Sequence, residues 1–204
     1  LIRRLPAVET LGATTILCTD KTGTLTKNQM TVMSLFVGNR RFEVTGDGYV
    51  PVGDIYEAGS RLPEVPLSVR ALLTAGALCN HTSLSQHGGT WHIDGDPTEG
   101  AILVTAAKIG LVKTTLEAEH PFVGEIPFDS ERKLMTVVRL TLGEMEAYVK
   151  GATGAVLRHS TRYAADDGSL LPLDDTYREL VHEVERSYAK QALRVLAVAR
   201  RTLH

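Results

Sequence analysis

Residues 20 to 26 read DKTGTLT, and no other segment of the chain has residue types so well suited to phosphoryl chemistry. The segment follows the apolar run 14–19, a pattern that predicts a short strand ending in an exposed acidic tip. A carboxylate there, open to Mg²⁺ and to a phosphate, suits in-line attack on a phosphoryl group. We therefore predict that Asp20 is a nucleophile that forms an aspartyl-phosphate. Gly23 would let the backbone approach the phosphate, and Thr22 could donate to its oxygens.

A second string, GDPTEGAI over residues 95–102, has two interpretations. Asp96 can cap a helix with Pro97 first and Glu99 third, which is a capping box that needs no ligand. The string also resembles a segment of the nucleotide-binding domain of ATP-driven cation pumps, and the resemblance implies that Glu99, with Thr98 beside it, lies at the adenine and accepts from its exocyclic amine. Guanine presents a carbonyl at the corresponding place, so such a contact would distinguish the two bases. Spacing leaves both interpretations open, and they can coexist.

Five more positions could complete a nucleotide site. Phe128 stands before a polar loop and could stack on adenine, although a lone phenylalanine more often belongs to a core. Lys133 could direct its ammonium toward the ribose or the phosphates. Lys150 and Gly151 end a predicted strand, where the lysine supplies charge and the glycine permits close approach. Arg194 has a fork of donors that suits phosphate oxygens, although such an arginine can equally pair with a nearby carboxylate.

Composition limits the class of protein. The 204 residues can bury one sizeable core and part of a second, so we expect one domain and a fragment of another. With 22 basic and 24 acidic residues, the chain has no basic excess to favour nucleic acid, and we expect none as a partner. Cys18 and Cys79 do not make a disulfide framework, and the seven histidines show no metal-ligand spacing. No window approaches the roughly eighteen apolar residues of a membrane-spanning helix.

Hydrophobic periodicity predicts a mixed fold of α/β class, in which an antiparallel sheet is flanked by helices. Polar stretches near residues 46–59 and 83–89 indicate loops. The expected strands cover 14–19, 31–37, 41–44, 134–140, 145–150 and 194–199, and the expected helices cover about 66–79, 97–109 and 174–191.

The DKTGTLT string is the phosphorylation signature of the P-type ATPases, and the surrounding RRLPAVETLGATTILCTDKTGTLTKNQMTV resembles the type II cation pumps, the calcium-pump group especially. The resemblance implies that residues 1–27 are a fragment of a phosphorylation domain of haloacid-dehalogenase type and that residues 28–204 are the nucleotide-binding domain. It implies catalytic roles for Asp20, Lys21 and Thr22, with Asp20 and Thr22 in an incomplete Mg²⁺ site. It also implies ATP binding by Thr98, Glu99, Phe128, Lys133, Lys150, Gly151 and Arg194.

The sequence departs from related patterns at three positions. Thr22 stands where related phosphatases carry a second aspartate as general acid and base, so we expect a phosphoenzyme that persists. Thr153 and Gly154 replace the proline and acidic residue that usually follow the lysine–glycine–alanine motif. Later phosphorylation-domain motifs, which hold the phosphate and complete the Mg²⁺ site, are not found in the chain. We expect the chain alone to be a monomer that binds ATP weakly and does not turn it over.

The resemblance also implies a larger parent protein. The chain opens on Leu1 rather than methionine, and we expect an excised cytoplasmic segment of an integral protein of the plasma or inner membrane. Its partners would be ATP and the transmembrane and actuator domains of a cation pump, with calcium as the first candidate ion. Two alternatives stay open: a phosphatase or phosphotransferase of the haloacid dehalogenase group, and a non-catalytic adenine-nucleotide sensor.

Overall fold

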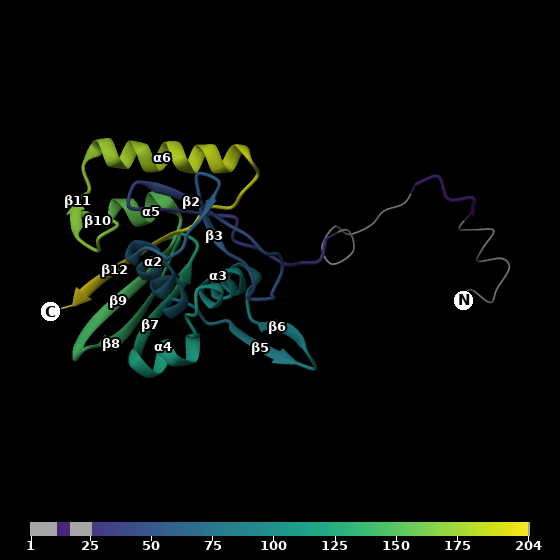
Figure 1. Ribbon diagram of the computed structural model, residues 1–204, viewed down its shortest axis with the longest axis horizontal. Helices are drawn as coiled ribbons and strands as arrows, with labels where there is room; N and C mark the ends of the chain where they lie inside the picture. The colour runs from purple at the N-terminus through teal and green to yellow at the C-terminus, as the bar shows by residue number, and fades with distance from the viewer. Residues whose placement is uncertain (1–11, 17–25, 204) are drawn as a thin grey trace.

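An antiparallel sheet of four strands lies at the centre of the computed structural model, which describes residues 12–16 and 26–203. Its strands are β7 (Phe122–Asp129), β8 (Leu134–Thr141), β9 (Glu144–Gly151) and β12 (Ala197–Leu203), in the order β12-β9-β8-β7 (Figure 1). Leu142 and Gly143 join β8 to β9 with φ of 50° and 87°, the left-handed pair that a two-residue hairpin turn of type I′ requires.

Two clusters of buried side chains cover the two faces of this sheet. The larger cluster joins alternate strand residues such as Met135, Val137 and Tyr148 to the helices α2 (Leu67–Leu78), α3 (Pro97–Lys108) and α4 (Lys113–Glu119). On the other face Leu134 packs against α5 (Thr153–Arg158). Alternation along β8 therefore sends neighbouring side chains into different layers. Each fully buried aliphatic or aromatic side chain contributes about 1.5–3 kcal/mol.

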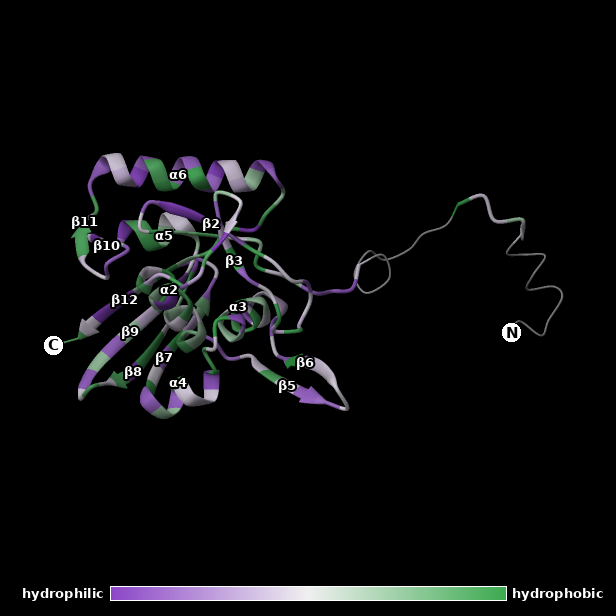
Figure 2. Cartoon of the chain, viewed as in Figure 1, coloured by the Kyte–Doolittle hydropathy of each residue, from purple (hydrophilic) through white to green (hydrophobic). Residues whose placement is uncertain are grey.

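The helix α6 (Asp175–Lys190) runs alongside α5 at the margin of the molecule (Figure 1). Hydrophilic and hydrophobic bands alternate along it in Figure 2, as expected for an amphipathic helix with one face on the protein. Asp174 caps its first turn by accepting from the amide of Tyr177 at 2.8 Å. None of the helices in the described ranges is long and apolar enough to cross a membrane.

Smaller sheets surround the central one. A second antiparallel sheet contains β1 (Ser34–Val37), β2 (Arg40–Val44), β3 (Ile55–Glu57) and β4 (Ser60–Arg61), in that order. Two separate hairpins are formed by β5 (Ser83–His87) with β6 (Thr90–Asp94), and by β10 (Arg162–Ala164) with β11 (Leu170–Pro172). Arg40 joins the second sheet to the loop after β10, because its guanidinium pairs with both Glu57 and Asp166.

Most of the elements predicted from periodicity are confirmed. The predicted helices correspond to α2, α3 and α6 within a residue or two, and the predicted strands 31–37, 41–44, 134–140 and 145–150 correspond to β1, β2, β8 and β9. The prediction of loops over 46–59 and 83–89 is wrong where β3 and β5 form. The sequence of β5 has a polar pattern because one face of the hairpin is open to solvent, and Gly88 and Gly89, both at positive φ, close its turn.

Two strand predictions need correction. The strand expected over 194–199 begins only at Ala197, because the chain first ends α6 with Ala192 in the left-handed region and then crosses to the sheet. The amide of Leu193 bonds back to the carbonyl of Tyr188 at 3.1 Å, which completes that helix end. Of the strand expected over 14–19, residues 14–16 are not in a strand, and the remainder lies outside the described residues.

Candidate functional site

An ion pair between α3 and the end of β9 forms the centre of the candidate site. The Lys150 ammonium lies 2.5 Å from Oε1 of Glu99, and the two side chains are only 8% and 14% exposed. Lys150 also donates to the carbonyl of Cys79, the residue after α2, at 2.8 Å. The pair therefore joins two helices to the central sheet in a position mostly withdrawn from water.

The second carboxylate oxygen of Glu99 binds the linker between α2 and β5. It accepts from the amides of His81 and Thr82 at 2.8 and 3.2 Å, and Oγ1 of Thr82 lies 3.4 Å away. Burial raises the pKa of Glu99, but the hydrogen bond and charge of Lys150, together with the two amides, outweigh burial and hold this pKa below its usual value. Glu99 is therefore an ionised, fixed acceptor.

Of the capping box predicted for residues 95–102, the Asp96 cap is confirmed and the return contact of Glu99 is not. Oδ1 of Asp96 accepts from the amides of Thr98 and Glu99 at 2.8 and 3.1 Å, and Pro97 is the first helical residue. These amides offset the burial that raises the pKa of Asp96, and its pKa is lowered overall. The reciprocal half of a capping box is not formed, because the Glu99 side chain turns to Lys150 instead. Capping thus leaves this carboxylate available to the site.

Gly151 is required by a close approach of backbone. A Cβ atom at this position would lie 2.1 Å from the carbonyl oxygen of Lys133, which accepts from the amide of Ala152 at 3.1 Å. Lys133 has a φ of 57° in the turn between β7 and β8, and its side chain is exposed. The structure therefore places Lys133 beside the end of β9 that carries Lys150.

Phe128 lies near the end of β7 and is 62% exposed, so the interpretation of this residue as part of the core is wrong. Asp129 pairs with Leu134, which belongs to the α5 face of the sheet. The pairing of β7 with β8 is irregular between Ile126 and Asp129, so Phe128 lies in a bulged stretch. This stretch is at the same end of the sheet as Lys150, because Leu134 pairs with Gly151. An exposed aromatic ring is thus available at the end of the sheet where the ion pair lies.

Arg194 and Thr98 are brought together although they are 96 positions apart in the sequence. Nη1 of Arg194, in the segment before β12, donates to Oγ1 of Thr98 at 3.2 Å. The arginine is exposed, and its positive charge contributes to the lowered pKa of Asp96. No ion pair of Arg194 with a carboxylate is found among the described residues. This bond places the exposed guanidinium beside the first turn of α3.

Four residues that hold the site together have no recognisable signal in the sequence. Nδ2 of Asn80 donates to the Glu99 carbonyl at 2.9 Å, and Lys113 donates to two carbonyls of the same linker. Nε2 of His81 lies 2.5 Å from a carboxylate oxygen of Glu125 on β7. Asn80 and Lys113 bind backbone carbonyls, and His81 belongs to an irregular linker, so no hydrophobic period or motif spacing could have indicated these contacts.

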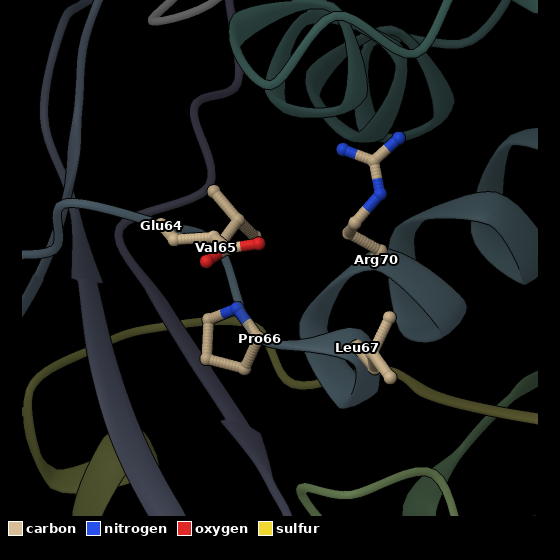
Figure 3. Close-up of a pocket in the computed structure, with 5 residues that line it drawn as sticks. All are labelled: Glu64, Val65, Pro66, Leu67 and Arg70. Carbon is tan, nitrogen blue, oxygen red and sulfur yellow. The ribbon is translucent and has the colours of Figure 1, made fainter.

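Three predicted residues, Asp20, Lys21 and Thr22, lie outside the described residues, and the Mg²⁺ site predicted at Asp20 and Thr22 stays a prediction. Within the described ranges, no three His, Cys, Asp or Glu side chains are grouped so that they could hold a metal ion. A cavity of about 540 Å³ lies elsewhere, at the start of α2, and contains none of the predicted residues (Figure 3). It is lined by Glu64, Val65, Pro66, Leu67 and Arg70.

Comparison with known proteins gives a consistent result. Residues 68–204 match the family model for the P-type ATPase, cytoplasmic domain N. The whole chain is 40% identical to the cation-transporting ATPase pma1 of Synechocystis sp. and 39% identical to a calcium-transporting ATPase of Bacillus subtilis, and covers 23% of each. Over 98% of its length it is 36% identical to the calcium-transporting ATPase type 2C member 1 of Bos taurus, of which it covers 21%. The chain thus spans less than a quarter of these relatives.

Proposed function

Because the chain belongs to the P-type ATPases and its residues 68–204 match their cytoplasmic domain N, we propose that it binds ATP for a cation-transporting pump. The observation that supports this most directly is the largely buried Glu99–Lys150 pair at the end of the sheet where the exposed Phe128 also lies. A buried ion pair costs desolvation that a pair of apolar side chains would avoid, so it is weak support for stability and better support for a site.

The adenine end of the ligand would lie against these three residues. The Phe128 ring offers a stacking surface, and Oε1 of Glu99 retains capacity to accept from the exocyclic amine. Lys150 uses two donors on Glu99 and Cys79, which leaves the third for a ring nitrogen of the base. Guanine would turn a carbonyl toward the Glu99 carboxylate, so the site would favour adenine.

The phosphate end would lie toward the positive charges of Arg194 and Lys133. Arg194 has unused guanidinium donors beside the first turn of α3, and Lys133 is exposed at the β7–β8 turn. Together they supply a planar fork and a point charge, both suited to phosphate oxygens. Thr98 orients Arg194 through its hydroxyl, which is the role we assign to it.

In the intact parent, we propose that Asp20 accepts the terminal phosphoryl group of ATP. A carboxylate oxygen of Asp20 forms the new bond to the γ-phosphorus, the bond from that phosphorus to the bridging oxygen breaks, and ADP leaves. Lys21 would lie beside the acyl phosphate, and Thr22 would offer oxygen and donor groups. Mg²⁺ entering with ATP would neutralise phosphate charge, and the oxygens of Asp20 and Thr22 are of the donor type it prefers.

The parent we propose is an ATPase of the membrane, with this chain on its cytoplasmic side and with transmembrane and actuator domains as partners. Calcium is the first candidate for the transported ion, because several similar proteins are named calcium-transporting ATPases. Names of this kind favour a pump over the free-standing phosphatase and the nucleotide sensor. Alone, this chain would bind ATP and would not hydrolyse it.

The first test is an NMR titration of the chain with ATP and GTP. We expect ATP to shift the resonances of Glu99, Phe128 and Lys150, and GTP to shift them less at equal concentration. Complete absence of shifts up to millimolar ATP would refute nucleotide binding. For the parent, transfer of labelled γ-phosphate should stop in Asp20→Asn while ATP binding persists. Undiminished labelling of that variant would exclude Asp20 as the acceptor.

A further inference from the structure

We propose that Lys113, which the nucleotide site does not use directly, is a positioning residue for adenine recognition. This inference rests on the proposed function and adds to it a residue on α4, which is not an element of the predicted site. Lys113 would act through the linker between α2 and β5, which it holds in the place where that linker binds Glu99.

The contacts of Lys113 define its role. Its ammonium donates to the carbonyls of Asn80 and Thr82, at 2.8 Å each, and its side chain is only 16% exposed. Glu117, one turn along α4, lies 3.7 Å away and balances part of the charge. A largely buried ammonium with two backbone acceptors is a fixed group, because moving it would leave a buried charge without partners.

The same linker binds Glu99 from its other side. The amides of His81 and Thr82 donate to Oε2 of Glu99, while the carbonyls of Asn80 and Thr82 accept from Lys113. The peptide unit between Asn80 and His81 therefore has its carbonyl on Lys113 and its amide on Glu99. Since a peptide unit is planar and rigid, a displacement at one side is transmitted to the other.

Lys150 connects the start of the linker to Glu99. It donates to the carbonyl of Cys79 and to Oε1 of Glu99, so the two carboxylate oxygens are held by different parts of one framework. Without Lys113, the carbonyls of Asn80 and Thr82 would lose the side-chain donor that binds them both, and the linker would be held only by its bonds to α3 and to Lys150. The Glu99 carboxylate would then lose the fixed orientation with which it selects an amine over a carbonyl.

The chain offers a matched control in Lys108, the last residue of α3. Its ammonium also donates to two successive backbone carbonyls, those of Thr45 and Gly46, at 2.7 and 3.0 Å. That loop makes no hydrogen bond with Glu99 or with the α2–β5 linker. Lys108→Met thus removes the same kind of contact and leaves the framework of the site intact.

The experiment measures the affinities of wild type, Lys113→Met, Lys113→Arg and Lys108→Met for ATP and for GTP. We expect Lys113→Met to bind ATP about tenfold more weakly than wild type, which corresponds to the loss of one hydrogen bond to the base. Its affinity for GTP should change little. Lys113→Arg, which keeps the charge and several donors, should recover most of the preference for ATP. Lys108→Met should keep the wild-type ratio of affinities even if it lowers the melting temperature.

The outcomes separate this inference from the proposed function. A wild-type chain that binds no ATP refutes the proposed function itself. A wild type that prefers ATP, with the same preference in Lys113→Met and Lys108→Met, overturns the role of Lys113 alone. If Lys113→Met does not fold, wild-type NMR decides: the amides of His81 and Thr82 should shift with ADP as strongly as that of Gly151, and unmoved linker amides would overturn the inference.

Discussion

Replacing Lys150 by methionine tests the centre of the candidate site. The substitution keeps most of the apolar stem and removes the ammonium, so it breaks the bond to Glu99 at 2.5 Å and the bond to the Cys79 carbonyl at 2.8 Å. Both side chains of the pair are more than four-fifths buried. The Glu99 carboxylate and the Cys79 carbonyl, which lose their shared donor, could therefore not be well hydrated without local rearrangement. We therefore expect a loss of folding stability as well as of ATP affinity.

The size of the loss follows from what remains bonded. Removing one partner of a buried ion pair costs about 3–5 kcal/mol. Glu99 keeps its bonds from the amides of His81 and Thr82, so its charge is still partly compensated and the lower end applies. For a domain of this size, about 3 kcal/mol corresponds to a fall in melting temperature of roughly 6–12 °C.

The assay is urea unfolding followed by circular dichroism, with Lys150→Met, Glu99→Gln and the double variant forming a cycle. The double variant should be more stable than the sum of the single losses predicts, by about 1–3 kcal/mol, because each single variant leaves the other group buried and unpaired. A loss below about 1 kcal/mol in Lys150→Met, or strict additivity in the cycle, would refute the argument that this pair is held in a weakly hydrated place.

The pH dependence of the same pair has a definite sign. The folded-state pKa of Glu99 is lowered, so its stabilising contribution is fully present above the unfolded value of about 4.3 and is lost as the pH falls through the folded pKa. The difference in unfolding free energy between wild type and Glu99→Gln should therefore be constant near neutrality and shrink below about pH 4. A difference that grows on acidification would contradict this assignment.

Three further predictions concern single positions. Phe128→Ala should weaken ATP binding by about 1–3 kcal/mol while changing stability by less than about 0.5 kcal/mol, because the ring is exposed; equal ATP affinity in calorimetry would show that the ring does not stack on the base. Gly151→Ala should lower the free energy of unfolding by about 1–3 kcal/mol, because its Cβ would meet the Lys133 carbonyl at 2.1 Å; an unchanged urea midpoint would contradict this. Burial raises the pKa of Cys79 to about 11, so little of its thiol is ionised at pH 8. In a Cys18→Ser variant, iodoacetamide at pH 8 should therefore modify the folded chain about 100-fold more slowly than the urea-unfolded chain. Comparable rates would count against a buried thiol.

The sequence predicted the elements better than the contacts. The helices α2, α3 and α6 and the strands β8 and β9 were predicted because their apolar residues repeat with the period of the element. β5 was not predicted, because its solvent-facing residues make its sequence look like a polar loop. β12 was predicted to begin too early, because the amino-acid sequence does not show where a chain that leaves a helix joins a sheet. The short helices α4 and α5 are too brief to produce a clear period.

The site shows the same division. Motif resemblance selected Glu99, Lys150 and Phe128, and the structure brings the first two into contact while leaving the third exposed. The capping role of Asp96 could be read from residue types alone because it is local. Asn80 and Lys113 could not be found, because their partners are backbone groups of a linker whose course is set only by tertiary packing.

The hydrogen bond between Arg194 and Thr98 has a consequence for the order of assembly. It joins residues 96 positions apart, and the pair of Glu99 with Lys150 joins residues 51 apart, so the site is built almost entirely from distant parts of the chain. Contacts of such range form late, after the entropy of closing long loops has been met. Nucleotide affinity should consequently emerge only when β12 has docked beside β9, and a fluorescent ATP analogue added during refolding would report the completion of the central sheet.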